Sequence, residues 1–214
     1  MLNSQPLLSQ VDHLVYATRD LDKTVVELEE LMGVRATPGG QHPGRGTRNA
    51  LISLGPSAYL EIIGPDPAQE IPPVRRWFSI DQLREPRIVT WAAKTNDVGA
   101  AVARAAGGGV QLGPVLEGSR QRPDGVKLSW QYTNPDMIVA DGIVPFLINW
   151  GASPHPASGW KGEVTLLELK AEHPNPEQVR SQLQALGLVM PVDQAPRPGL
   201  TAILQTPNGR LDLC

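Results

Sequence analysis

A pattern of one strand, one capped helix and further strands occurs three times along this chain and limits the folds open to it. In the first copy, residues 11–17 (VDHLVYA) alternate between two sets of side chains, which predicts a strand. Asp20 follows, and its carboxylate is expected to accept hydrogen bonds from the free N–H groups that begin a helix. Apolar residues recur at helical spacing between 21 and 32, and Gly33 stands where a left-handed helix end is expected.

The second and third copies repeat this order. A strand at 87–94 precedes Asp97 as the helix cap, and a strand at 163–170 precedes Asn175, with Pro176 in the first helical position. Further strands are expected near 50–54, 59–63, 110–115, 127–133, 143–150, 188–192, 200–205 and 210–213. Repetition at this spacing predicts an α+β fold of repeated βαβββ units. Two units (11–64 and 87–151) form a domain at 1–151, and a third, smaller unit occupies 163–214.

Composition narrows the class of protein. Glycine and proline number 21 each in 214 residues, which favours short elements joined by many turns over long helices. The net charge is −3, so the basic surface that nucleic acid or anionic lipid requires is absent. The apolar runs are too short for a membrane helix, and the first ten residues do not resemble a signal peptide. The one cysteine, Cys214, excludes an internal disulfide. We expect a cytoplasmic protein whose partner is a small molecule.

The segment 39–49 (GGQHPGRGTRN) carries the densest set of candidate binding groups. Its glycines let the backbone approach a ligand closely, and His42, Arg45, Thr47 and Asn49 present polar groups. Arg45 is suited to clamping a substrate carboxylate through two hydrogen bonds. We expect His42 to contact the ligand and to shuttle a proton, because imidazole titrates near neutral pH. The alternative is an ordinary solvated loop.

Other segments carry weaker signals. The proline-rich stretch 65–86 contains Trp77 and is expected to pack as a lid or a short helix, whereas 152–162 is expected to be a connector. Arg120 and Trp130 belong to a basic and aromatic stretch, but the acidic balance of the chain argues against nucleic acid. We interpret 116–142 as a mobile specificity loop.

Repeated βαβββ units with a histidine on the first strand and a glutamate on the last resemble the vicinal oxygen chelate superfamily. Here those residues are His13 in VDHLVYATRDLD and Glu61 in AYLEIIG. The chain is most similar to the glyoxalase-like domain family, through GGQHPGRGTRNALISLGPSAYLEIIGPDP and through GIVPFLINWG followed by HPAS. The resemblance implies paired modules whose curved mixed sheets surround a cup for a metal or a ligand. The reactions it implies include isomerisation, epimerisation, ring cleavage and thiol transfer, and some relatives sequester antibiotics without a metal.

The resemblance also implies one divalent metal (Mg, Mn, Fe, Ni or Zn), with His13 and Glu61 as ligands. Such sites take a second pair of ligands from a second module, but here that module offers Thr90 and a last strand, VPFLINW, without a carboxylate. The third unit offers Glu168 and Asp212 as weaker candidates. The alternative is that both are ordinary edge-strand acids.

The function expected from the resemblance is a metal-assisted lyase, isomerase or dioxygenase that acts on a small oxygenated metabolite. Arg45 would orient the substrate, and Trp150 and His155 would line the same cup. One alternative is a metal-free protein that binds and sequesters a small molecule, and another is an enzyme that uses His42 without a metal. Three units leave one without a partner, so the third either packs outside the paired modules or pairs in a homodimer.

Overall fold

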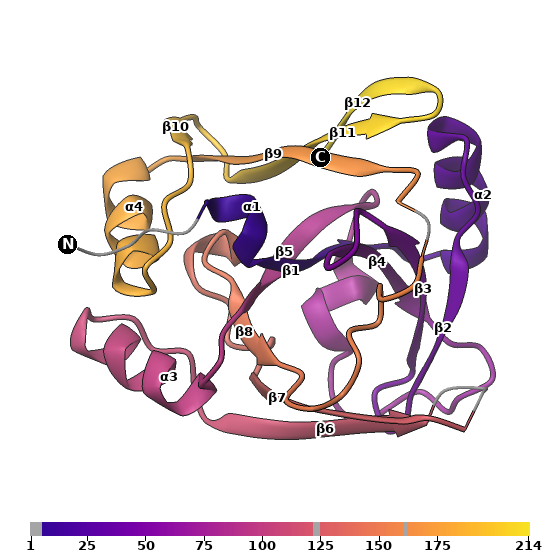
Figure 1. The fold of residues 1–214 in the computed structure, drawn as a ribbon, viewed down its shortest axis with the longest axis horizontal. Helices are drawn as coiled ribbons and strands as arrows, with labels where there is room; N and C mark the ends of the chain where they lie inside the picture. The colour runs from indigo at the N-terminus through magenta and orange to yellow at the C-terminus, as the bar shows by residue number, and fades with distance from the viewer. Residues whose placement is uncertain (1–5, 122–124, 161) are drawn as a thin grey trace.

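Residues 6–121, 125–160 and 162–214 are described by the computed structural model, and they form two β-sheets (Figure 1). The larger sheet has eight strands in the order β2-β3-β4-β1-β5-β8-β7-β6 and curls around a central space. The smaller sheet has four strands in the order β10-β9-β11-β12. The predicted α+β fold of repeated modules around a cup is confirmed.

The larger sheet consists of two βαβββ modules joined edge to edge. The first runs through β1 (Val11–Ala17), α2 (Leu21–Met32), β2 (Thr37–His42), β3 (Thr47–Ser53) and β4 (Tyr59–Pro65). The second runs through β5 (Arg87–Lys94), α3 (Val98–Gly107), β6 (Val115–Gln121), β7 (Lys127–Thr133) and β8 (Phe146–Asn149). In each module the first strand pairs in parallel with the last, and β1 and β5 pair antiparallel to join the modules. The cup is therefore walled by strands from both modules.

The third unit has the same element order but a different pairing. It comprises β9 (Thr165–His173), α4 (Pro176–Ala185), β10 (Val192–Gln194), β11 (Gly199–Thr206) and β12 (Gly209–Leu213). Its first strand, β9, lies between β10 and β11, whereas β1 and β5 each pair with the fourth strand of their own module. The element order predicted from sequence thus recurs, but hydrogen bonding between strands distinguishes this unit from the other two.

Two of the three predicted helix caps are present. The carboxylates of Asp20 and Asp97 accept hydrogen bonds from backbone N–H groups three residues later, at 3.1 and 2.9 Å. Gly33 ends α2 in the left-handed conformation, with φ of 73°. The predicted cap at Asn175 is wrong: its side chain makes no capping bond, and its backbone N–H donates to Nδ1 of the buried His173.

Strands replace both the solvated loop considered for 39–49 and the mobile loop expected at 116–142. Residues 37–42 form β2, and the turn that follows leads directly into β3, so the glycine-rich segment is a hairpin. The prediction of a mobile loop at 116–142 is wrong over β6 and β7, which pair along their length. The strand expected at 127–133 is present as β7, whose residues alternate between exposed and less exposed positions, whereas the strand expected near 110–115 lies at 115–121 as β6.

The two sheets share one hydrophobic core. Trp91 on β5 and Leu204 on β11 are both fully buried and belong to the same cluster of packed side chains. The short helix α1 (Leu7–Gln10) lies between β9 and the start of β1 (Figure 1). The third unit therefore buries its inner face within the chain. In the described part of the chain, no helix is long and apolar enough to cross a membrane.

Candidate functional site

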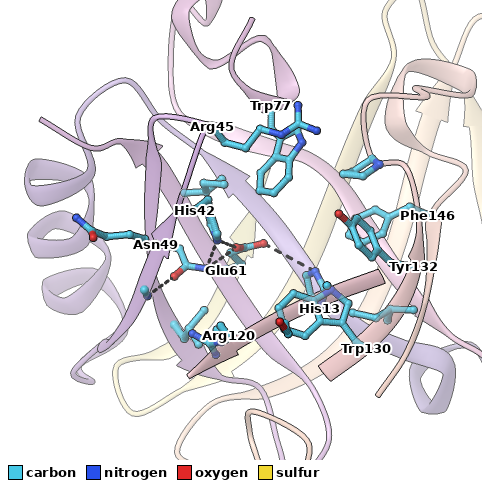
Figure 2. Close-up of a pocket in the computed structure, with 18 of the residues that line it drawn as sticks. His13, His42, Arg45, Asn49, Glu61, Trp77, Arg120, Trp130, Tyr132 and Phe146 are labelled. Atoms are coloured by element: carbon cyan, nitrogen blue, oxygen red, sulfur yellow. Dashed lines mark hydrogen bonds and ion pairs between the residues drawn. The ribbon is translucent and has the colours of Figure 1, made fainter. Parts of the chain in front are cut away.

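A cavity of about 360 Å³ opens on the inner side of the curled sheet. Strands of both modules line it, and so does the 3-10 helix η1 (Trp77–Gln82), which lies in the segment expected to form a lid or a short helix. The predicted site residues that line it are His13, His42, Arg45, Asn49, Glu61 and Trp150. Figure 2 shows several of these side chains pointing toward one another.

His13 is aimed into the cavity by a local irregularity of β1. The pairing of β1 with β5 shifts register between Val11 and His13, which leaves Asp12 in a bulge. The bulge lets two neighbouring side chains meet, and Asp12 Oδ1 lies 2.8 Å from His13 Nδ1. His13 also stacks on Tyr59, with ring centroids 4.7 Å apart. These contacts hold the imidazole with Nε2 facing the cavity.

Asp12 is a fully buried carboxylate with three side-chain partners. Besides His13, its oxygens accept a hydrogen bond from Trp150 Nε1 at 3.1 Å and lie 3.3 Å from His155 Nε2. Burial alone would raise the pKa of Asp12, but its hydrogen bonds and charge interactions with the two histidines outweigh burial and hold that pKa well below 3.8. Because an ionised carboxylate only accepts hydrogen bonds, Nδ1 of His13 carries a proton, and Nε2 is the ring nitrogen that faces Glu61.

Glu61 lies between the two cavity histidines (Figure 2). Its Oε1 accepts a hydrogen bond of 2.5 Å from Asn49 Nδ2 and lies 3.9 Å from His42 Nε2. Its Oε2 lies 3.8 Å from His13 Nε2. The Asn49 amide is itself held by the backbone N–H of Gly40, which donates to Oδ1 at 2.8 Å. The glycine-rich hairpin thus orients the carboxylate.

His42 is held at the other side of Glu61. Its Nδ1 lies 2.9 Å from Thr47 Oγ1, and Nε2 lies 3.4 Å from the Asn49 amide nitrogen. Burial lowers the pKa of His42 below 6.5, with a smaller contribution from Arg120 that the charge of Glu61 opposes. The neutral imidazole is therefore favoured. Thr47 is fully buried behind His42 and is not among the residues that line the cavity.

Arg45 stands at the cavity wall against η1. Its Nη1 donates to Asp136 Oδ2 at 3.1 Å, and its Cζ lies 4.8 Å from the centroid of the Trp77 ring. The guanidinium therefore already has a carboxylate partner within the chain, and it stacks on Trp77.

Several cavity residues were not proposed from the sequence as site residues. They are Trp77, Arg120, Trp130, Tyr132 and Phe146. Trp130 and Tyr132 alternate with exposed residues along β7, a period-two pattern that points them to one face of the hairpin. A strand at 127–133 was expected from the sequence, but its place over the cavity depends on the pairing of β7 with β8.

The pairing of the modules identifies the residue opposite His13. The capping residues Asp20 and Asp97 begin equivalent helices, and His13 and Thr90 each lie seven residues before them. Thr90 is therefore the counterpart of His13, as expected from the sequence. A threonine hydroxyl is a poor replacement for an imidazole in binding a divalent metal.

The counterpart of Glu61 follows from strand register. Val15 pairs with Glu61 in β1 and β4, and the corresponding Ala92 pairs with Phe146 in β5 and β8. Phe146 thus occupies the position where a second carboxylate would stand, and its ring lies 5.4 Å from that of His13. Among the described residues, no group of three or more His, Cys, Asp or Glu side chains is arranged to hold a metal. His13 and His42 each approach Glu61 in a pair without forming a three-ligand group, which falls short of the three protein ligands usual for a catalytic zinc, so the donor set does not fit a protein-held metal.

The weaker candidates Glu168 and Asp212 lie elsewhere. Both are exposed residues of the smaller sheet, on β9 and β12. The strand β11 separates them, and each pairs with the same residue, Ile203. The structure does not bring them together with His13 and Glu61.

Two βαβββ modules joined around a cavity with a strand-borne histidine and glutamate define a glyoxalase-like class of protein. The family model for the glyoxalase-like domain matches residues 11–187, and the chain belongs to that family. No curated protein matches the chain.

Solved structures resemble the chain to different degrees. A hypothetical protein from Staphylococcus aureus has a TM-score of 0.66 at 15% identity, over 88% of this chain and 87% of that one. Methylmalonyl-CoA epimerase from Streptomyces coelicolor has a TM-score of 0.45 at 24% identity, over 69% of this chain and 98% of that one. The corresponding Mycobacterium tuberculosis enzyme has a TM-score of 0.42 at 22% identity, over 69% and 91%. These similarities concern the fold alone.

Proposed function

We propose that the protein is an enzyme that moves a proton on a carbon next to a carbonyl group of a small oxygenated metabolite, as isomerases and lyases do. The observation that supports this proposal is the pair of His13 Nε2 and Glu61 Oε2, which face each other across 3.8 Å at the cavity wall. An imidazole and a carboxylate placed side by side are suited to removing a proton and returning it.

The neighbours of this pair give each member a defined orientation. Asp12 holds the proton on His13 Nδ1 and leaves Nε2 to take part in transfer. Asn49 occupies Glu61 Oε1 and leaves Oε2 nearest to His13. In the proposed reaction His13 or Glu61 takes the carbon-bound proton, and negative charge develops on the carbonyl oxygen.

His42 serves in this scheme as a neutral donor or proton shuttle near the developing charge. The pKa of His42 is lowered by burial, so the uncharged imidazole is favoured at neutral pH. Thr47 orients its ring through Nδ1. Trp150 serves the same scheme indirectly, because its indole N–H donates to Asp12.

Deuterium exchange tests the proposal. The protein is incubated in D₂O with a panel of 2-oxo acids and 1,2-dicarbonyl compounds, and loss of the C–H signal next to the carbonyl is followed by proton NMR. We expect exchange with at least one compound, reduced about 100-fold or more in both His13→Gln and Glu61→Gln. Glu172→Gln, an exposed change on β9, is the matched control and keeps the wild-type rate. Exchange no faster than in buffer across the panel, or equal rates in all variants, contradicts the proposal.

A second candidate is binding without turnover. The aromatic side chains around the cavity favour it, because they supply apolar surface that retains a ligand without reacting with it. Tight binding of a panel compound with no exchange would favour this function over the first.

A metal-assisted reaction is the third candidate, and the 3.8 Å separation of His13 and Glu61 supports it. A divalent metal (Mg, Mn, Fe, Ni or Zn) would supply a Lewis acid there. No step is assigned to it, because the donor set is incomplete. Elemental analysis of protein purified without chelator or affinity tag tests this candidate. We expect much less than one equivalent of metal, whereas one equivalent that is lost in both His13→Ala and Glu61→Gln would favour metal-assisted chemistry over the proposal.

A further inference from the structure

Arg120 places a positive charge on the cavity wall, and none of the described carboxylates pairs with it. Its side chain lines the cavity and forms no hydrogen bond or ion pair within the described part of the chain. Arg45, the other arginine that lines the cavity, is paired with Asp136. Figure 2 shows Arg120 and Arg45 on opposite sides of Glu61. A half-buried guanidinium with unused donors is a ready site for a carboxylate, which it binds through two parallel hydrogen bonds.

The rest of the cavity wall is largely aromatic. Trp130 and Trp150 lie with ring centroids 5.1 Å apart, and Tyr132 follows at 6.5 Å from Trp130. Phe146 closes the wall beside His13, and Trp77 lies across the cavity (Figure 2). Aromatic faces arranged in this way bind flat rings through offset stacking and edge contacts.

The Trp130 wall depends on a glycine. Gly118 on β6 pairs directly with Trp130 on β7, and a Cβ atom at Gly118 would lie 2.4 Å from the indole ring. The absent side chain lets the indole lie close over β6. On the opposite side, Trp77 also lines the cavity, and its buried Nε1 has no hydrogen-bond partner in the described residues.

We propose that the cavity takes a planar aromatic carboxylate, whose carboxylate pairs with Arg120 and whose ring lies against Trp130 and its aromatic neighbours. The cavity volume of about 360 Å³ falls in the range of small-ligand pockets. The inference rests on the proposed function only in using the same cavity, because binding does not require turnover. In this proposal Arg120 binds the carboxylate of the ligand, whereas Arg45, which is paired with Asp136, holds Trp77 in place.

Isothermal titration calorimetry on the full chain tests the proposal with three probes. 2-Naphthoate has both the ring and the charge, 2-naphthamide has the ring alone, and cyclohexanecarboxylate has the charge alone. We expect 2-naphthoate to bind at least about tenfold more tightly than either of the others. Arg120→Gln removes this advantage and leaves the affinity for 2-naphthamide unchanged. Arg197→Gln, an equal change of charge at an exposed position remote from the cavity, leaves all three affinities unchanged.

The aromatic wall is tested separately with Trp130→Leu, which keeps an apolar side chain and removes the flat surface. We expect 2-naphthoate binding to weaken about tenfold in this variant. No binding of 2-naphthoate to the wild type, or equal affinity of wild type and Arg120→Gln, overturns the proposal. If the protein exchanges protons on aliphatic compounds but does not bind 2-naphthoate, this inference is overturned and the proposed reaction stands. If 2-naphthoate binds in a way that depends on Arg120 but no compound undergoes exchange, the proposed reaction is overturned and this inference stands.

Discussion

Asp12 carries a negative charge at a place from which water is excluded. The carboxylate is tolerated because His13, Trp150 and His155 surround it. The contact with His13 joins neighbouring residues, but the other two join distant parts of the chain: Trp150 and His155 come from the end of the second module and from the segment after it. The segment expected to be a connector therefore contributes to the site, through His155.

Replacement of Asp12 by asparagine should lower stability and change its dependence on pH. The variant keeps the shape and loses the charge that accepts from His13, so we expect a loss of about 1–3 kcal/mol at pH 7. The folded-state pKa of Asp12 lies below its unfolded value, so its stabilisation is present above about pH 4 and is lost as the pH falls further. Urea denaturation between pH 3 and 7 measures both effects.

In this series the wild type loses its advantage over Asp12→Asn below about pH 4. A constant difference between the two proteins across the whole pH range contradicts the assignment of the charge to Asp12.

At the scale of elements, capping residues and glycines determined where segments begin and end. The caps Asp20 and Asp97 and the helix end at Gly33 follow from residue type alone, because each satisfies backbone groups within a few residues. The strand at 127–133 was expected from the sequence, but β6 was placed near 110–115 and the stretch 116–142 was interpreted as a mobile loop, because its side chains contact a cavity made by the rest of the chain.

Two glycines of the second module should respond to alanine in opposite directions. Gly99 lies inside α3 with space around its Cα, and Gly99→Ala is expected to stabilise the protein by about 0.5–1 kcal/mol. Gly142 has φ of 93°, and a Cβ there would lie 2.0 Å from the carbonyl oxygen of Val89, so Gly142→Ala is expected to destabilise it by more than that. Thermal or urea unfolding of both variants measures this, and shifts of the same sign contradict it.

At the scale of the whole molecule, the smaller sheet is part of the same cooperative unit as the cavity-bearing sheet. Leu204 and Trp91 belong to one core although they lie on different sheets. Because the third unit finds its partner within the chain, the fold itself does not need a second copy. A homodimer stays a prediction, which light scattering tests.

Leu204→Ala should therefore lower the stability of both sheets together. All five tryptophans precede residue 163, so tryptophan fluorescence reports on the residues before the smaller sheet. We expect the fluorescence and far-UV circular dichroism midpoints to fall together, by an amount equivalent to about 2–5 kcal/mol. A fluorescence midpoint that stays at the wild-type value would mean that the sheets unfold independently.

The sequence by itself determined the order of the elements, the helix limits and the residues from which a site was to be built. Alternation, caps and repeats are local signals, so they were legible without a structure, and the signature around His13, His42 and Glu61 indicated the family. Only the tertiary structure decided which of these side chains meet. The bulge at Asp12, the counterpart position of Phe146 and the curl of β7 over the cavity depend on strands that are far apart in the chain. Contacts of that kind are set by the register and curvature of the sheet, which the sequence does not show residue by residue.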